Sequence, residues 1–95
     1  MAAYALAESL EVTDPDTMAE YGKLARETIA QYGGKVLAAG PSETIEGEWT
    51  PNRLVLIEFE SMKALKTWYN SPEYQAALPL RLRSARDNFI CLNGL

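Results

Sequence analysis

The chain has 95 residues, 47% of them apolar, and a formal net charge of −4, with no histidine and one cysteine. This length predicts one domain over residues 1–95 with a thin core, and the acidic balance lacks the positive surface that nucleic-acid binding requires. Without histidine, serine–histidine and cysteine–histidine nucleophile pairs, histidine-ligated zinc and a proximal haem histidine are excluded, and one cysteine excludes an intramolecular disulfide.

Residues 3–12 alternate in size along the chain. Tyr4 and Leu6 fall on one face of an extended segment, and three alanines fall on the other. A period of two predicts a strand. The small residues on one face indicate that a helix packs closely against it.

A helix is expected next, between Asp14-Pro15-Asp16 and Gly33-Gly34. Asp14 can accept hydrogen bonds from the free N–H groups of a first turn, and proline suits the first helical position. Apolar and aromatic residues, Tyr21 among them, recur at three- and four-residue steps and mark a buried stripe. The paired glycines end the helix because the residue that closes a helix in the left-handed conformation is usually glycine.

Two further strands are predicted on either side of a polar segment. Residues 35–39 form a short strand that stops at Gly40-Pro41, and residues 53–60 form a strand that is apolar on both faces, as expected for a central strand. The segment 42–52 between them is rich in turn residues but contains Trp49. We interpret Trp49 as an anchor at a subunit interface, a pocket wall or an exposed ring.

The last third of the chain predicts a helix in two parts and a closing strand. Ser61 can cap the first part, and Ser71-Pro72-Glu73 begins the second. Pro79 cannot donate to the carbonyl four residues before it, so we expect the helix to break or kink there. Residues 88–92 are apolar and form the closing strand, in which Cys91 is expected to be buried and inert.

The order β-α-β-β-α-β predicts an α+β, ferredoxin-like fold, in which a four-stranded antiparallel sheet carries both helices on one face. The opposite face would then expose Tyr4, Leu6, Leu54 and Leu56. Pairing two such sheets face to face buries these side chains and forms a dimeric α/β barrel. We therefore expect a homodimer.

Two segments of the chain resemble a bacterial family catalogued as domain of unknown function 1330. They are Arg53–Phe59 and the following Trp68–Gln75, which reads Trp-Tyr-Asn-Ser-Pro-Glu-Tyr-Gln. Further residues match the family pattern: Asp14-Pro15, Tyr21, Tyr32-Gly33-Gly34, Glu46-Gly47, Trp49 and Arg81. The chain departs from the pattern at Glu60, where the family prefers proline.

This family is similar in fold to the dimeric α/β barrels, which pair ferredoxin-like sheets across a two-fold axis. Relatives in that superfamily include cofactor-independent monooxygenases, haem-handling enzymes, lactone isomerases and stress-responsive proteins. The resemblance therefore implies the fold and the dimer but not the chemistry, because one fold serves many functions.

Glu58 is the candidate catalytic residue. It lies on the expected central strand in an otherwise apolar face, and a carboxylate shielded from water needs a partner or a raised pKa. Arg53 or Arg81 can supply the opposite charge, and Tyr4, Tyr69 or Tyr74 can supply hydroxyl donors. We expect a ligand-binding pocket formed by Arg53, Glu58, Tyr69, Tyr74 and Arg81, with Glu58 as general base or ligand anchor. The alternative is a structural ion pair at the end of the strand.

Partners and location follow from what the sequence lacks. No stretch approaches the roughly 18 continuous apolar residues of a membrane span, and the first ten residues lack a basic segment, so we expect neither a membrane partner nor a signal peptide. With the single cysteine, this indicates a cytoplasmic location. The one basic cluster, Arg81, Arg83 and Arg86, is typical of a solvated helix face, so no nucleic-acid partner is expected. No cofactor and no metal are expected either.

Three functions remain open. The first is a dimeric module that binds a small organic molecule between sheet and helices; it requires a pocket but tolerates Glu58 in a salt bridge. The second is a cofactor-independent enzyme of the isomerase or monooxygenase type, which requires Glu58 and tyrosines in a pocket. The third is a structural or stress-responsive dimer, which predicts no cavity large enough for a ligand.

Overall fold

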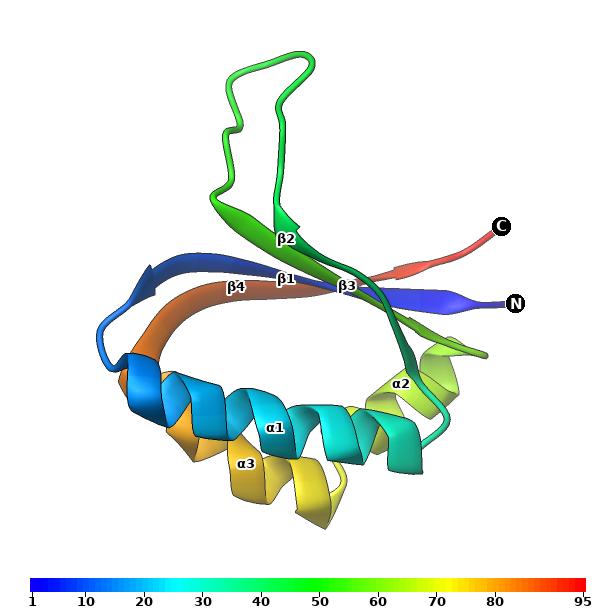
Figure 1. Ribbon diagram of the computed structural model, residues 1–95. Coiled ribbons are helices and arrows are strands. Elements are labelled where there is room, and N and C mark those ends of the chain that lie inside the picture. The colour runs from blue at the N-terminus through cyan, green and yellow to red at the C-terminus, as the bar shows by residue number, and fades with distance from the viewer.

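The computed structural model describes residues 1–95 and arranges them in two layers, a sheet and a layer of helices (Figure 1). The strands are antiparallel and lie in the order β2-β3-β1-β4, which is the ferredoxin-like βαββαβ fold predicted above. None of the helices is long and apolar enough to cross a membrane. The elements in chain order are β1 (Ala3–Val12), α1 (Pro15–Gln31), β2 (Lys35–Pro41), β3 (Arg53–Phe59), α2 (Met62–Tyr69), α3 (Pro72–Ser84) and β4 (Ala85–Asn93).

The helix starts follow the predicted capping pattern. The side chains of Asp14, Ser61 and Ser71 each accept a hydrogen bond from the backbone N–H three residues further on, at 3.0 to 3.2 Å. These bonds satisfy N–H groups that have no partner inside the helix. Gly33, with φ of +79°, turns the chain after α1, as expected for a glycine at a helix end.

We expected a break or a kink at Pro79. The break is wrong, because α3 continues through this residue from Pro72 to Ser84. The missing N–H of Pro79 frees the carbonyl of Gln75, four residues earlier. Both residues are exposed, so water can satisfy that carbonyl. The chain then enters β4 at Ala85, three residues before the predicted start of the closing strand.

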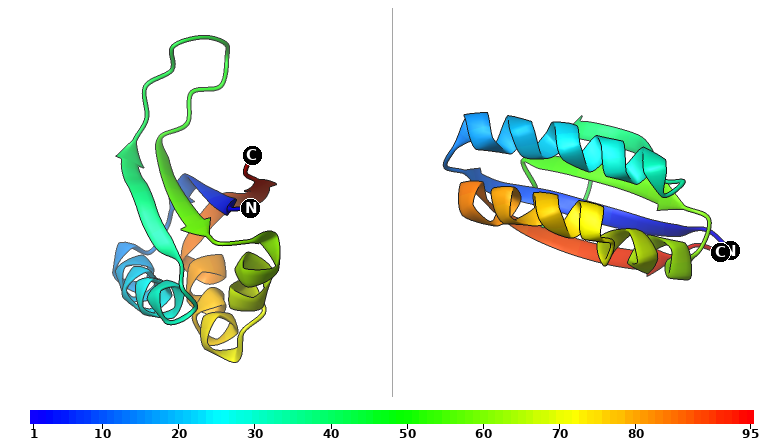
Figure 2. Two further views of the ribbon diagram at one scale, coloured as in Figure 1. Left: turned by 90° about the vertical axis from the view of Figure 1, so that its right-hand side faces the viewer. Right: turned by 90° about the horizontal axis from the view of Figure 1, so that it is seen from below.

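All three helices cover the same face of the sheet. Figure 2 shows α1 on one side and the α2–α3 pair on the other, lying side by side under the strands. Ala3 and Ala5 of β1 are fully buried beneath them, and Ile57 and Phe59 of β3 are buried beside these alanines. The ring of Trp68 in α2 packs at 5.3 Å from the ring of Phe59, centroid to centroid, and completes this core. The small side chains of β1 thus allow the close helix approach that the sequence indicated.

The other face of the sheet has no cover within this chain. We call it the free face; its side chains are Tyr4, Leu6, Leu54, Leu56, Glu58, Ile90 and Leu92. Leu6 lies opposite Leu56 in the β1–β3 pair and opposite Ile90 in the β1–β4 pair. Ile90 and Leu92 are 58% and 68% exposed, which is unusual for a continuous row of large apolar side chains.

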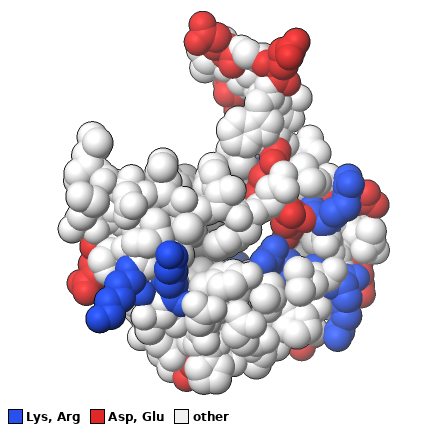
Figure 3. Space-filling model, turned by 180° about the vertical axis from the view of Figure 1, so that it is seen from behind, with Lys and Arg blue, Asp and Glu red and all other residues white.

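Residues 42–52, which we call the arm, connect β2 to β3 and project away from the helices (Figure 1). The indole Nε1–H of Trp49 in the arm donates to the Glu8 carboxylate at 2.9 Å, and the Asn88 amide donates to the same carboxylate at 3.0 Å. These hydrogen bonds lower the pKa of Glu8 below its usual value of 4.5. The foot of the arm is mostly uncharged and its tip is acidic (Figure 3), with Glu43, Glu46 and Glu48 all exposed.

Candidate functional site

A cavity of about 550 Å³ lies between α1 and the sheet. Small residues line it from both layers: Ala7 of β1, and Gly22 and Ala25 of α1. Its volume falls within the range of roughly 300–1,000 Å³ that small-molecule sites occupy. Most of its walls are apolar, and they include Met18, Ile29, Val36, Val55, Ile57, Trp68 and Phe89.

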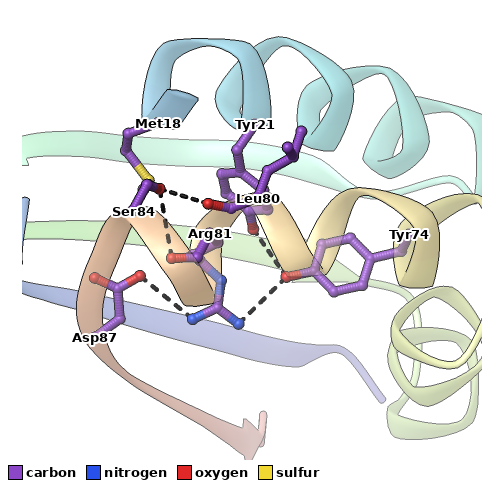
Figure 4. Close-up of polar contacts among 7 residues, drawn as sticks. All are labelled: Met18, Tyr21, Tyr74, Leu80, Arg81, Ser84 and Asp87. Atoms are coloured by element: carbon purple, nitrogen blue, oxygen red, sulfur yellow. Dashed lines mark hydrogen bonds and ion pairs between the residues drawn. The ribbon is translucent and has the colours of Figure 1, made fainter. Parts of the chain in front are cut away.

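Arg81 lies at one end of this cavity in a buried polar cluster (Figure 4). Its Nη1 donates to Asp87 Oδ2 at 3.3 Å, and its Nη2 lies 3.5 Å from the hydroxyl of Tyr74. The hydroxyls of Tyr74 and Tyr21 are 2.8 Å apart. The guanidinium carbon also lies 5.8 Å from the centre of the Tyr21 ring and 5.6 Å from that of the Phe89 ring, within cation–π range. Three separate elements, α1, α3 and β4, therefore meet at this cation.

Burial determines the protonation behaviour of the cluster. It raises the pKa of Tyr21 well above that of a free phenol, and the neighbouring Tyr74 raises it further, so Tyr21 stays neutral. Burial acts to lower the pKa of Arg81, but Tyr74, Tyr21 and Asp87 together raise it above its usual value. Arg81 is therefore a permanent cation, and Tyr21 cannot serve as a base near neutral pH.

Two polar atoms of this cluster have no partner. The side chains of Arg81 and Asp87 are only 8% and 5% exposed. Arg81 Nε and Asp87 Oδ1 are buried and make no hydrogen bond. Such atoms are rare in folded proteins, because an unsatisfied buried donor or acceptor costs about 1–3 kcal/mol. Both residues line the cavity, but these two atoms have almost no accessible surface, so other atoms of the two side chains form its wall.

The structure brings together only some of the residues that the sequence singled out. Tyr74 and Arg81 are in contact, and Arg53 lines the same cavity from the start of β3, although it is exposed. The ring of Tyr69 packs at 5.3 Å from the ring of Tyr74, centroid to centroid, and belongs to the aromatic core rather than to the cavity wall.

Glu58 lies apart from the other four residues. It points to the free face, where it pairs in the sheet with Tyr4 of β1 and Lys35 of β2. The cavity is on the other side of the sheet. Of the two cations that we expected to balance Glu58, Arg81 contacts Asp87 instead and Arg53 lines the cavity. No pocket surrounds Glu58, so its catalytic role stays a prediction.

Two further expectations are wrong. Arg83 and Arg86 are exposed as predicted, but Arg81 is 7% exposed and belongs to the core, so the basic cluster is not one solvated face. Cys91 is exposed rather than buried. It lies near the end of β4, which is an edge strand of the sheet.

Sequence reasoning missed Tyr21 and Asp87 as members of a site. Tyr21 was recognised only as part of a buried helical stripe. Asp87 was missed because the closing strand was predicted to begin at residue 88. The signal that was available is the period of two along β4, which places Asp87 on the same helix-facing side as Phe89. No group of three acidic or cysteine side chains is arranged to hold a metal ion.

Comparison with known proteins gives a family match and a set of similar folds. A family model described as "Domain of unknown function (DUF1330)" matches residues 2–95. No curated protein matches the chain.

Three solved structures illustrate the similarity of fold. A protein of unknown function from Rhodopseudomonas palustris is 19% identical, with a TM-score of 0.77 over 99% of this chain and 82% of that one. A dimeric ferredoxin-like protein of unknown function from Jannaschia sp. CCS1 is 17% identical, with a TM-score of 0.75 over 99% of this chain and 100% of that one. SnoaB, a cofactor-independent oxygenase from Streptomyces nogalater, is 8% identical, with a TM-score of 0.64 over 99% and 92% of the two chains.

Proposed function

We propose that this chain, which belongs to the domain of unknown function 1330 family, is a dimeric module that binds a small organic molecule in the cavity between α1 and the sheet. The observation that carries this proposal is the cavity itself, with about 550 Å³ of space, mostly apolar walls and a few buried polar groups at one end. That combination is characteristic of small-molecule sites. In this proposal residues 1–95 act as one domain, and the single cysteine fits a cytoplasmic location.

A cofactor-independent enzyme is the second candidate, and Asp87 favours it more than Glu58 does. Asp87 is the one carboxylate among the residues that line the cavity, and carboxylates are common general bases. The likeness to an oxygenase at 8% identity supports only the fold. The hypothesis of a purely structural dimer predicts no cavity of ligand size, so the cavity of about 550 Å³ disfavours it.

The dimer is proposed from the free face. Leu6, Leu54 and Leu56 form an apolar row on it that a monomer would leave partly in water. A second copy of the chain, placed sheet to sheet, covers this row in both subunits at once, as a two-fold interface requires. The arm stands on the same side of the sheet, held at its foot by the Trp49–Glu8 hydrogen bond. A relative of the same fold is described as dimeric, which supports the proposal.

The two tryptophans allow a direct test of binding. Trp68 lines the cavity and donates its indole N–H to Thr28 at 3.0 Å, whereas Trp49 is 57% exposed on the arm. We would titrate the ¹⁵N-labelled protein with a panel of small bicyclic aromatic compounds. Binding in the cavity should shift the indole N–H resonance of Trp68 in a saturable way and leave that of Trp49 unchanged. If no compound shifts Trp68, the proposed function is contradicted.

A matched pair of variants shows whether the cavity is the site. Gly22 lines the cavity, and a side-chain carbon placed there has only Arg26 Nη1 nearby, at 3.5 Å, an ordinary contact. Gly22→Leu should therefore fold and occupy part of the cavity. Ala30→Leu adds the same side chain at an exposed position of the same helix, outside the cavity. The first variant should abolish the Trp68 shift, and the second should retain it.

A further inference from the structure

The cavity opens to solvent between α1 and the edge of the sheet that β2 forms. Figure 2 shows α1 lying under this edge. Exposed residues line the cavity there from both layers: Ala19 and Arg26 of α1, Val36 and Ala39 of β2, and Arg53 at the start of β3. We call these five residues the mouth. The interior is closed by the buried ring of Trp68 and the half-buried ring of Phe89.

The mouth carries positive charge in an acidic protein. Arg26 and Arg53 are the only charged residues in the cavity wall that are exposed. The other two charged residues in the wall, Arg81 and Asp87, bind each other, so their charges cancel. The whole chain has 13 acidic and nine basic residues, and the sign at the mouth is therefore opposite to that of the molecule. A local charge beside low-dielectric walls attracts ions of the opposite sign.

The chain supplies no carboxylate to either of these arginines. The one ion pair of the structure is the buried pair in the interior. Along α1, none of the residues three and four positions before and after Arg26 is acidic, and these are the positions that a helix brings next to it. In the sheet, Arg53 lies opposite Ser9 of β1 and Pro41 of β2. Both guanidinium groups are therefore available to an anion from outside.

Each of the two charges lies at the cavity and not merely near it. Arg26 Nη1 is 3.5 Å from the point where a side chain at Gly22 would begin, and Gly22 lines the cavity. Arg53 shares the helix-facing side of β3 with Val55 and Ile57, two and four residues further on, and all three line the cavity. One cation thus comes from the helix layer and the other from the sheet, and each contributes independently.

Resting on the proposed function, we infer that the ligand is an organic acid with a compact apolar body, held with its carboxylate at the mouth beside Arg26 and Arg53 and its body in the interior. The N–H groups of arginine match the oxygens of a carboxylate. At the mouth the carboxylate keeps part of its hydration, so binding buries no charge. The apolar body leaves water for the rings of Trp68 and Phe89. The reverse orientation would bury the carboxylate against an ion pair that is already balanced.

Three naphthalene compounds of similar shape test this inference on the unaltered protein. 2-Naphthoate is an anion, 2-naphthamide is neutral and 2-naphthylmethylammonium is a cation. The Trp68 indole resonance reports each binding curve. We expect 2-naphthoate to bind roughly five- to tenfold more tightly than the amide, because one exposed ion pair contributes up to about fivefold. The ammonium compound should bind more weakly than the amide, because the mouth repels it.

The outcomes separate this inference from the function on which it rests. Tightest binding of 2-naphthoate supports both. Equal affinities for the acid and its amide overturn the ligand class and leave the binding function standing, and tightest binding of the amide or of the ammonium compound does the same. No shift of Trp68 with any of the three compounds overturns both.

A pair of variants shows whether the two arginines cause the preference. The double variant Arg26→Gln, Arg53→Gln removes both charges at exposed, unpaired positions, and it should bring the affinity of 2-naphthoate to within about twofold of that of the amide. Arg83→Gln makes the same chemical change at an exposed position outside the cavity and should retain the preference. A preference that persists in the double variant overturns the inference.

Salt provides a second measurement that needs no variant. Exposed charges are screened over about 30 Å at 0.01 M salt and about 3 Å at 1 M salt. Between these conditions the affinity of the unaltered protein for 2-naphthoate should fall to about that for the amide, and the affinity for the amide should not fall. An advantage of 2-naphthoate that is the same in both conditions overturns the inference, whether or not the double variant folds.

Discussion

Removing the carboxylate of Asp87 should destabilise the protein far more than removing an exposed acid does. In Asp87→Ala, the guanidinium of Arg81 loses its only ion-pair partner while it stays buried between the rings of Tyr21 and Phe89. A guanidinium group stays charged at any pH at which the protein is studied. The variant therefore leaves an uncompensated buried cation.

The size of the effect follows from that burial. Breaking a buried ion pair by removing one partner costs about 3–5 kcal/mol, whereas an exposed pair is worth roughly 1 kcal/mol or less. With side-chain exposures of 8% and 5%, Arg81 and Asp87 belong to the first group. For a domain of this size each kcal/mol lowers Tm by about 4–8 °C, so Tm should fall by at least about 12 °C.

Urea unfolding at fixed protein concentration measures this loss, with Glu60→Ala, an exposed acid, as the control. Protein concentration has to be constant because association contributes to apparent stability. Replacing both partners, as Arg81→Met with Asp87→Leu, should recover most of the loss, because an apolar pair of similar volume has no charge to leave uncompensated. A loss below about 1 kcal/mol in Asp87→Ala, or a double variant as unstable as the sum of the single ones, would refute this reasoning.

Three more predictions test other parts of the structure. Gly34→Ala should destabilise by about 1–3 kcal/mol in the same unfolding assay, because its new carbon would lie 2.6 Å from the Phe59 ring. The Trp49 indole N–H resonance should move as pH falls below 4.5, because a lowered pKa means that the Glu8 hydrogen bond is complete above that value and lost on protonation; a constant resonance contradicts this. Leu56→Glu should convert the dimer to monomer in analytical ultracentrifugation whereas Lys63→Glu should not, and an unaltered protein that is monomeric at micromolar concentration contradicts the interface.

Much of the fold was predictable because its signals are local. The alternation along β1 and the capping residues Asp14, Ser61 and Ser71 act within a few residues of where they stand, and the structure confirms each of them. The helix break predicted at Pro79 is wrong because the cost of a missing hydrogen bond depends on whether water reaches the freed carbonyl. That exposure is a property of the folded molecule and not of the local sequence.

The candidate site was harder to predict because its members come from distant segments. Alternation placed Glu58 on the same face as Leu54 and Leu56, and this is correct, but that face is the free one and not the wall of the cavity. The partner of Arg81 is Asp87, six residues later, across the junction where α3 becomes β4. A strand start misplaced by three residues was enough to hide it.

The most direct test of the central claim is a crystal structure of the protein in complex with a bicyclic aromatic compound that shifts the Trp68 resonance. The account predicts the ring system of this compound between α1 and the sheet, beside Trp68 and Phe89. A cavity collapsed onto its own side chains, or a compound bound only on the free face, would contradict it.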